Sequence, residues 1–196
     1  MTAATRTQKL TQTAVLTAIT ILLALTPLGY IPINPLITIT IMVTPVVIGG
    51  LLCGWPYGLF LGLVFGLSSF FRAPYEPIGQ IILSQSALIT FLVCVIPRMT
   101  VGLLGGLGHA LACKREVLNR FWFFLITGLL GSLLNTVGVL GFIGLAFDPG
   151  KTGITGAVIF GIVSINGSIE AVANAFLVGT LGKALQRFTQ ILKTRK

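Results

Sequence analysis

Long apolar stretches separated by short polar breaks dominate the chain. No charged residue lies between Lys9 and Arg72, and none lies between Arg120 and Asp148. A helix that crosses a membrane needs about 20 mostly apolar residues, so each of these intervals can hold one or more crossings. The pattern therefore predicts a chain that crosses a membrane several times.

We predict six membrane-spanning helices, joined by turns that contain proline and glycine. The proline-rich turn GYIPINP precedes the second helix, and CGWP at 53–56 makes a tight reversal before the third. The predicted spans cover about residues 10–28, 37–52, 57–71, 97–113, 121–147 and 154–185.

The segment at 72–96 does not fit one simple helix. It begins with the polar break RAPYEP and continues as apolar sequence interrupted by glutamines and serines. Irregular backbone is tolerated at membrane depth where it lines a cavity. We therefore predict a long, partly re-entrant outer loop between the third and fourth helices, with the fourth helix beginning at Pro97.

Composition supports a membrane protein. Of the 196 residues 55% are hydrophobic and 9% are charged, and the mean hydropathy is +1.00. A soluble domain carries about 25% charged residues. We expect residues 1–196 to form a single all-α membrane domain. So apolar a chain has no water-exposed face on which a basic patch could form, so the net charge of +9 does not indicate nucleic-acid binding.

The distribution of basic residues predicts the orientation. Six crossings place both termini on one side, and cytoplasmic loops are enriched in Lys and Arg. The opposite side holds Arg72, Arg98 and Lys151. The side of the termini holds Arg6, Lys9, Lys114, Arg115, Arg120, Lys183, Arg187, Lys193, Arg195 and Lys196. Both termini are therefore predicted to be cytoplasmic.

A few polar residues interrupt the apolar helices. Glu170 and Asn166 are four residues apart in the last helix, so they share a face. A charge inside a span costs about 2.5–3.5 kcal/mol on insertion scales and usually faces the bundle interior or a water-filled cavity. With Asn135 at similar depth and Arg98 at the outer start of the fourth helix, these residues predict either an outward-opening polar pocket or a structural network that fixes helix packing. Arg98 alone also fits an arginine reaching the membrane interface.

Small residues form two stripes. Gly58, Gly62 and Gly66 share one face of the third helix, which predicts close packing inside the chain. Ala14 and Ala18 are also four apart, near the start of the first helix. They indicate either ordinary internal packing or a docking surface for another membrane protein.

The chain offers no catalytic set. The segment GKT at 150–152 lacks the earlier glycine of a phosphate-binding loop, since position 145 is Leu, and it follows an apolar helix. His109 is the only histidine, and the three cysteines lack the spacing of metal ligands. We therefore expect no enzyme, no metal and no cofactor.

Several of these features together resemble the S component, the substrate-binding membrane subunit of energy-coupling factor (ECF) vitamin transporters. They are the short six-span chain with a basic inner side, the Ala14 and Ala18 pair, GYIPINP, the glycine-punctuated hairpin TPVVIGGLLCGWPYGLFLGLVFGLSS at 44–69, Pro97-Arg98, and Asn166-Gly167-xx-Glu170. The segments PVVIGG, GLVFGLSS, IPR and SINGSIE most resemble the pantothenate branch.

The resemblance implies a protein of the bacterial cell membrane that captures a vitamin from outside. It implies a membrane coupling subunit and two cytoplasmic ATPases as partners, with ATP hydrolysed in those partners and Ala14 and Ala18 contacting the coupling subunit. For pantothenate, Arg98 would pair with the carboxylate, and Asn135, Asn166 and Glu170 would take hydroxyl and amide groups. Asn34 in GYIPINP is a further candidate contact.

Two alternatives remain beside the pantothenate hypothesis. One is an S component for riboflavin, folate, thiamine, pyridoxine or hydroxymethylpyrimidine. The other is a stand-alone channel or secondary carrier, a class that often shows internal repeats.

Overall fold

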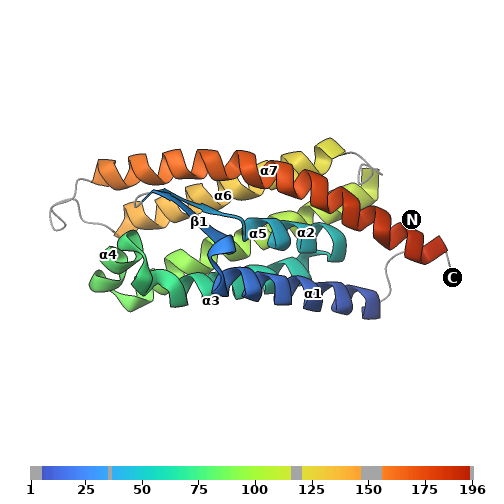
Figure 1. The fold of residues 1–196 in the computed structure, drawn as a ribbon, viewed down its shortest axis with the longest axis horizontal. Helices are drawn as coiled ribbons and strands as arrows, with labels where there is room; N and C mark the ends of the chain where they lie inside the picture. The colour runs from blue at the N-terminus through green and yellow to red at the C-terminus, as the bar shows by residue number, and fades with distance from the viewer. Residues whose placement is uncertain (1–5, 35–36, 116–120, 147–155, 195–196) are drawn as a thin grey trace.

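A computed structural model describes residues 6–34, 37–115, 121–146 and 156–194. Arg120, Lys151, Arg195, Lys196 and the GKT segment at 150–152 lie outside these ranges. Within them the chain forms an elongated helical bundle (Figure 1). The helices are α1 (Arg6–Leu25), α2 (Val43–Cys53), α3 (Trp55–Arg72), α4 (Pro77–Gln85), α5 (Ala87–Arg115), α6 (Phe121–Ala146) and α7 (Gly156–Thr194), with 3-10 turns at Pro27–Gly29 and Ala73–Tyr75.

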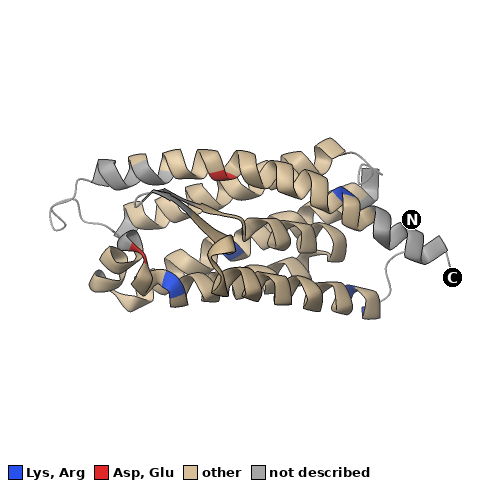
Figure 2. Cartoon of the chain, viewed as in Figure 1, with Lys and Arg blue, Asp and Glu red and all other residues tan. Residues whose placement is uncertain are grey.

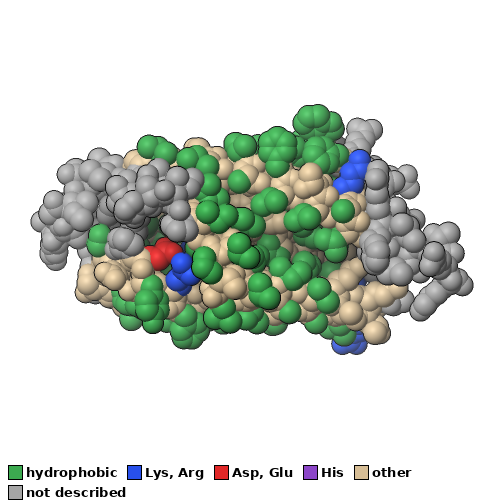
Figure 3. Space-filling model, in the orientation of Figure 1, with side chains coloured by type: hydrophobic (Ala, Val, Ile, Leu, Met, Phe, Trp, Pro, Cys, Tyr) green, Lys and Arg blue, Asp and Glu red, His purple; other side chains and the backbone are tan. Residues whose placement is uncertain are grey.

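Several of the described helices are apolar and long enough to cross a membrane. Four stretches meet both criteria within the described residues, namely Arg6–Leu25, Trp55–Tyr75, Ala87–Ala112 and Phe121–Gly144. The start of α1 and the end of α7 lie at the same end of the bundle (Figure 1). Apolar side chains cover much of the face shown in Figure 3, as expected for a surface in contact with lipid.

The all-α expectation is wrong in one place, where the chain forms a β-hairpin. Strands β1 (Tyr30–Asn34) and β2 (Ile37–Thr40) pair antiparallel, with Tyr30 opposite Thr40. The predicted second span at 37–52 is therefore a strand followed by the 11-residue helix α2. The run ITIT alternates two β-branched residue types, which favour extended backbone over helix.

The predicted loop at 72–96 is also wrong. The segment contains a 3-10 turn and α4, and α5 begins at Ala87, ten residues before the predicted start at Pro97. Pro77 occupies the first turn of α4, where a missing N–H costs nothing. Pro97 instead lies inside α5, which continues through it.

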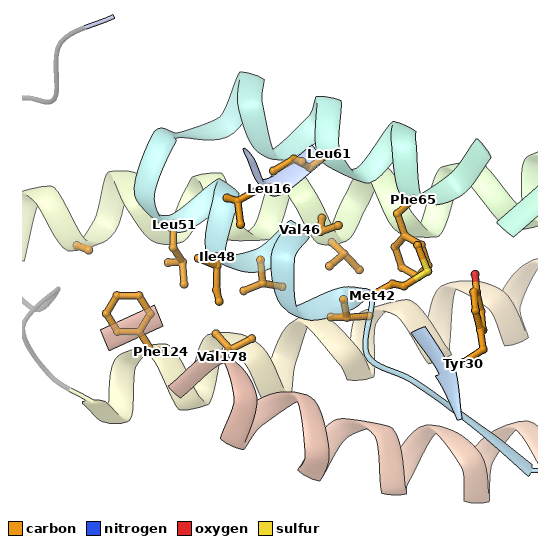
Figure 4. Close-up of a cluster of buried hydrophobic side chains, with 14 residues drawn as sticks. Leu16, Tyr30, Met42, Val46, Ile48, Leu51, Leu61, Phe65, Phe124 and Val178 are labelled. Carbon is orange, nitrogen blue, oxygen red and sulfur yellow. The ribbon is translucent and has the colours of Figure 1, made fainter. Parts of the chain in front are cut away.

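Helix α2 forms the centre of the apolar core. Residues 43–51 are all buried, and α2 contacts α1, α3, α5, α6 and α7. Figure 4 shows the surrounding cluster, in which Leu16, Leu61, Phe124 and Val178 approach α2 from four other helices. A helix that is hydrophobic on every side is expected to be buried on every side.

Helix α3 packs tightly against α5 through its glycines. A Cβ atom added to Gly58 would collide with the carbonyl of Gly102, and one added to Gly66 would lie 2.7 Å from the Cα of Val95. Gly62 meets the backbone of Arg98 in the same way. The predicted internal packing of this stripe is confirmed, and it fixes Arg98 beside α3.

Candidate functional site

A cavity of about 180 Å³ lies between the hairpin, the segment from α3 to α4, and helices α5, α6 and α7. A single water molecule needs only about 10–15 Å³ of cavity volume, so this cavity is large enough for a small molecule. Charged residues are sparse along the described bundle (Figure 2), yet several of them line this cavity.

Four of the five residues predicted to bind a substrate line the cavity. They are Arg98 on α5, Asn135 on α6, and Asn166 and Glu170 on α7. The fifth, Asn34, is the last residue of β1, and its side chain lies outside the described part of the structure. Three successive helices thus bring their polar residues to one place.

Arg98 folds back along its own helix. Its Nη1 donates a hydrogen bond to the carbonyl of Val93 at 2.9 Å, and the guanidinium carbon lies 5.4 Å from the centre of the Phe65 ring. Its Nε is buried and has no partner among the described residues. Arg98 therefore offers an unused cationic donor inside the protein, because a guanidinium cannot lose its charge there.

The two asparagines contribute unpaired acceptors. The Oδ1 atoms of Asn135 and Asn166 are buried and have no hydrogen-bond partner among the described residues. A buried polar atom left unpaired costs about 1–3 kcal/mol. Both atoms belong to residues that line the cavity.

Glu170 faces the end of the hairpin. Its Oε1 accepts a hydrogen bond from the backbone N–H of Thr40 at 2.8 Å. One turn later, Asn174 Nδ2 donates to the carbonyl of Thr40 at 2.9 Å, and Asn174 Oδ1 accepts from the hydroxyl of Thr44 at 2.9 Å. The sequence predicted either a polar pocket or a structural network at this face of α7. The structure shows both, because the face lines a cavity and its hydrogen bonds also hold β2 in place.

A second group of residues lines the more exposed side of the cavity, and the sequence analysis did not predict it. Arg72 Nε pairs with Glu76 Oε1 at 3.1 Å, and both side chains are about one-third exposed. The Arg72 guanidinium carbon lies 4.3 Å from the centre of the Tyr30 ring, and the Tyr30 hydroxyl is 3.0 Å from Ser69 Oγ. The arginine and glutamate of RAPYEP are four residues apart, and this spacing could have indicated that the two side chains form an ion pair.

Tyr30 lies in β1, outside the long helices, and is 6% exposed. Its hydroxyl forms a hydrogen bond with Ser69, and its ring lies beside the Arg72 guanidinium.

Ala14 and Ala18 lie on the exposed face of α1. The opposite face, with Thr13, Leu16 and Thr20, is buried against the bundle. Both alanines are therefore exposed, rather than buried, within the described part of the chain. Their surroundings are apolar and include exposed Leu10, Val15 and Ile19.

The fold and the cavity together define a helical membrane protein with a polar cavity large enough for a small molecule. Residues 8–182 match the family model described as "ECF transporter, substrate-specific component". The chain belongs to this family.

Two relatives carry names that specify a vitamin. The pantothenate transporter PanT of Leuconostoc mesenteroides subsp. mesenteroides is 32% identical, with 92% of this chain and 93% of the relative covered. The pantothenic acid transporter PanT of Lactococcus lactis subsp. cremoris is 28% identical, with 80% of each chain covered. The resemblance found in the sequence is thereby confirmed.

Proposed function

We propose that this chain captures pantothenate from outside the cell as the substrate-binding component of an ECF transporter. The observation that carries the proposal is the chemistry of the cavity. An unpaired cationic donor, Arg98 Nε, and two unpaired amide oxygens, on Asn135 and Asn166, belong to residues that line one cavity. The similarity to two proteins named for pantothenate supports the same ligand.

Pantothenate carries a carboxylate, an amide and two hydroxyl groups, which matches this set. Arg98 pairs with the carboxylate through a charge-assisted hydrogen bond. Asn135 and Asn166 accept hydrogen bonds from hydroxyl or amide groups, and Glu170 forms part of the same wall. Asn34, at the end of β1, is a further proposed contact from the hairpin.

The proposed topology has six crossings, made by α1, the hairpin with α2, α3, α5, α6 and α7. The start of α1 and the end of α7 share one end of the bundle, which is compatible with an even number. The basic residues near this end favour a cytoplasmic location for both termini. The whole chain then acts as one binding domain.

The proposed partners are a membrane coupling subunit and two cytoplasmic ATPases. Ala14 and Ala18 present a small, exposed surface on α1, which allows a partner helix to approach closely. ATP is hydrolysed in the partner subunits, and this chain contributes the ligand site. Co-purification with ATPase subunits distinguishes this assembly from a stand-alone channel or carrier.

Titration calorimetry on the purified chain in detergent tests the ligand. We expect tight binding of pantothenate and none of riboflavin, folate, thiamine, pyridoxine or hydroxymethylpyrimidine at the same concentration. Tight binding of another vitamin would retain the family function and refute pantothenate as the ligand. Failure of every vitamin to bind to demonstrably folded protein would refute the proposal.

A further inference from the structure

Pro97 leaves a carbonyl without its helical donor next to the cavity. Proline has no N–H, so inside a helix it removes the hydrogen bond to the carbonyl four residues earlier. In α5 that carbonyl belongs to Val93, which is 3% exposed and lines the cavity. A buried backbone carbonyl needs another donor, because leaving it unpaired is costly.

The neighbouring side chain supplies this donor. Arg98 Nη1 donates to the Val93 carbonyl at 2.9 Å, across five positions of the same helix. The bond holds the guanidinium group close to the helix axis, over Phe65 and along the cavity wall. In this position Arg98 Nε is buried and still unpaired among the described residues.

Pro97 is itself held in place by α6. A Cβ atom added to Gly138 would lie 2.9 Å from the Cβ of Pro97, so the ring packs directly against a glycine. This contact gives Pro97 a packing role as well. A useful experiment must therefore separate the loss of packing from the return of an N–H group.

We infer that Pro97 is a positioning residue for ligand recognition. By leaving the Val93 carbonyl without its helical donor, it directs the Arg98 guanidinium along the cavity wall, where this group meets the carboxylate of the ligand. The inference rests on the proposed function and adds to it the origin of anion selectivity. A lone arginine with four rotatable side-chain bonds would otherwise lose much conformational freedom on binding.

The test compares two ligands that differ at one group. Panthenol carries a primary alcohol where pantothenate carries the carboxylate, so the ratio of their Kd values measures recognition of the charge. Pro97→Ala and Pro97→Val both restore the N–H, and Val keeps most of the ring's volume. We expect the preference of each variant for pantothenate to fall by roughly tenfold, the scale of one charge-assisted hydrogen bond.

Two further variants isolate the cause. Val95→Ala removes side-chain volume from the same helix, where Val95 packs against Gly66, and leaves the Val93 carbonyl bond in place. It should keep the wild-type preference. Arg98→Met removes the guanidinium, and Pro97→Ala added to it should cause little further loss of pantothenate affinity.

A failure of this inference gives a different result from a failure of the proposed function. An unchanged ligand preference in folded Pro97→Ala or Pro97→Val, or an equal loss of affinity for both ligands, would overturn the inference and leave the proposed function intact. Restoring a helical N–H favours the helix, so both variants are expected to fold, as size-exclusion chromatography can check. If the wild-type chain bound no pantothenate, the proposed function would fail, and the inference with it.

Discussion

The region around α2 and the region around the cavity bury polar groups in different ways. Near α2, the hydroxyl of Thr20 donates to the Leu16 carbonyl at 2.8 Å, and His109 Nδ1 lies 2.7 Å from the Leu51 carbonyl. Around the cavity, polar atoms of Arg98, Asn135 and Asn166 are buried without partners among the described residues.

This difference indicates a division of roles along one bundle. The two polar groups named near α2 are paired within the protein, and the region is apolar and closely packed. The cavity region gives up some stability in order to keep donors and acceptors available. In the proposed transporter the first region carries the partner surface on α1, and the second binds the vitamin.

Breaking the packing around α2 is expected to have the largest effect. Gly58→Val would drive a side chain into the carbonyl of Gly102 and destabilise the fold by about 3 kcal/mol or more. Thermal unfolding in detergent should show a large fall in Tm, together with loss of pantothenate binding. Gly141→Val is the matched control, because nothing lies within 4 Å of the added Cβ, and it should unfold near the wild-type temperature.

Blocking the exposed surface of α1 should affect only the assembly with the partner subunits. Ala14→Trp or Ala18→Trp places a large ring on the small-residue face of α1, which should prevent docking and abolish uptake while pantothenate affinity stays unchanged. Uptake by cells and pull-down of the ATPases measure this. Val172→Trp, on an exposed position of α7, should transport normally. Normal uptake by both alanine variants would contradict the assignment of this face.

Removing one unpaired acceptor beside the cavity should weaken pantothenate binding without lowering the thermal stability of the fold. Asn135→Leu replaces a buried amide, whose Oδ1 is unpaired, by an apolar side chain of similar size. We expect Tm to stay constant or rise, since about 1 kcal/mol of polar burial is relieved, while the Kd for pantothenate increases roughly tenfold. A variant that loses both properties would show that Asn135 is required for packing.

Releasing the hairpin should have the smallest effect. Glu170→Ala removes the acceptor for the Thr40 N–H, so this amide should exchange with deuterium several-fold faster, an effect of about 1 kcal/mol. Glu170→Gln keeps an oxygen acceptor and should retain most of the protection. Equal exchange rates in wild type and Glu170→Ala would mean that Glu170 does not hold the hairpin in solution.

The sequence predicted those elements in which apolar length alone decides the structure. Helices α3 and α6 begin and end within two residues of the expected positions, because each is a long apolar run with a clear boundary at both ends. The CGWP turn precedes α3 and Arg72 ends it, while polar residues flank α6. The ITIT segment misled the prediction because an apolar run within a membrane protein suggests a helix, whereas β-branched residues paired with β1 form a strand. Pro97 misled it too, since proline usually begins a helix rather than lying inside one.

The site was predictable where polar residues interrupt a helix. Asn166 and Glu170 stand out in apolar sequence, and their spacing places them on one face. Tyr30, Thr40 and Arg72 lie in the hairpin or at a helix end, where polar residues are ordinary. Their proximity to the cavity depends on how the hairpin folds over the bundle, and no local pattern encodes that arrangement.

The short length of α2 has a consequence for how the protein meets its bilayer. Eleven residues of helix extend only about 16 Å, roughly half the hydrocarbon thickness of a membrane. A helix that short in contact with lipid would create a hydrophobic mismatch and thin the bilayer around it. Because other helices surround α2, only those longer helices set the thickness that the lipid must match. The bundle can therefore contain this short central helix without a mismatch to the membrane.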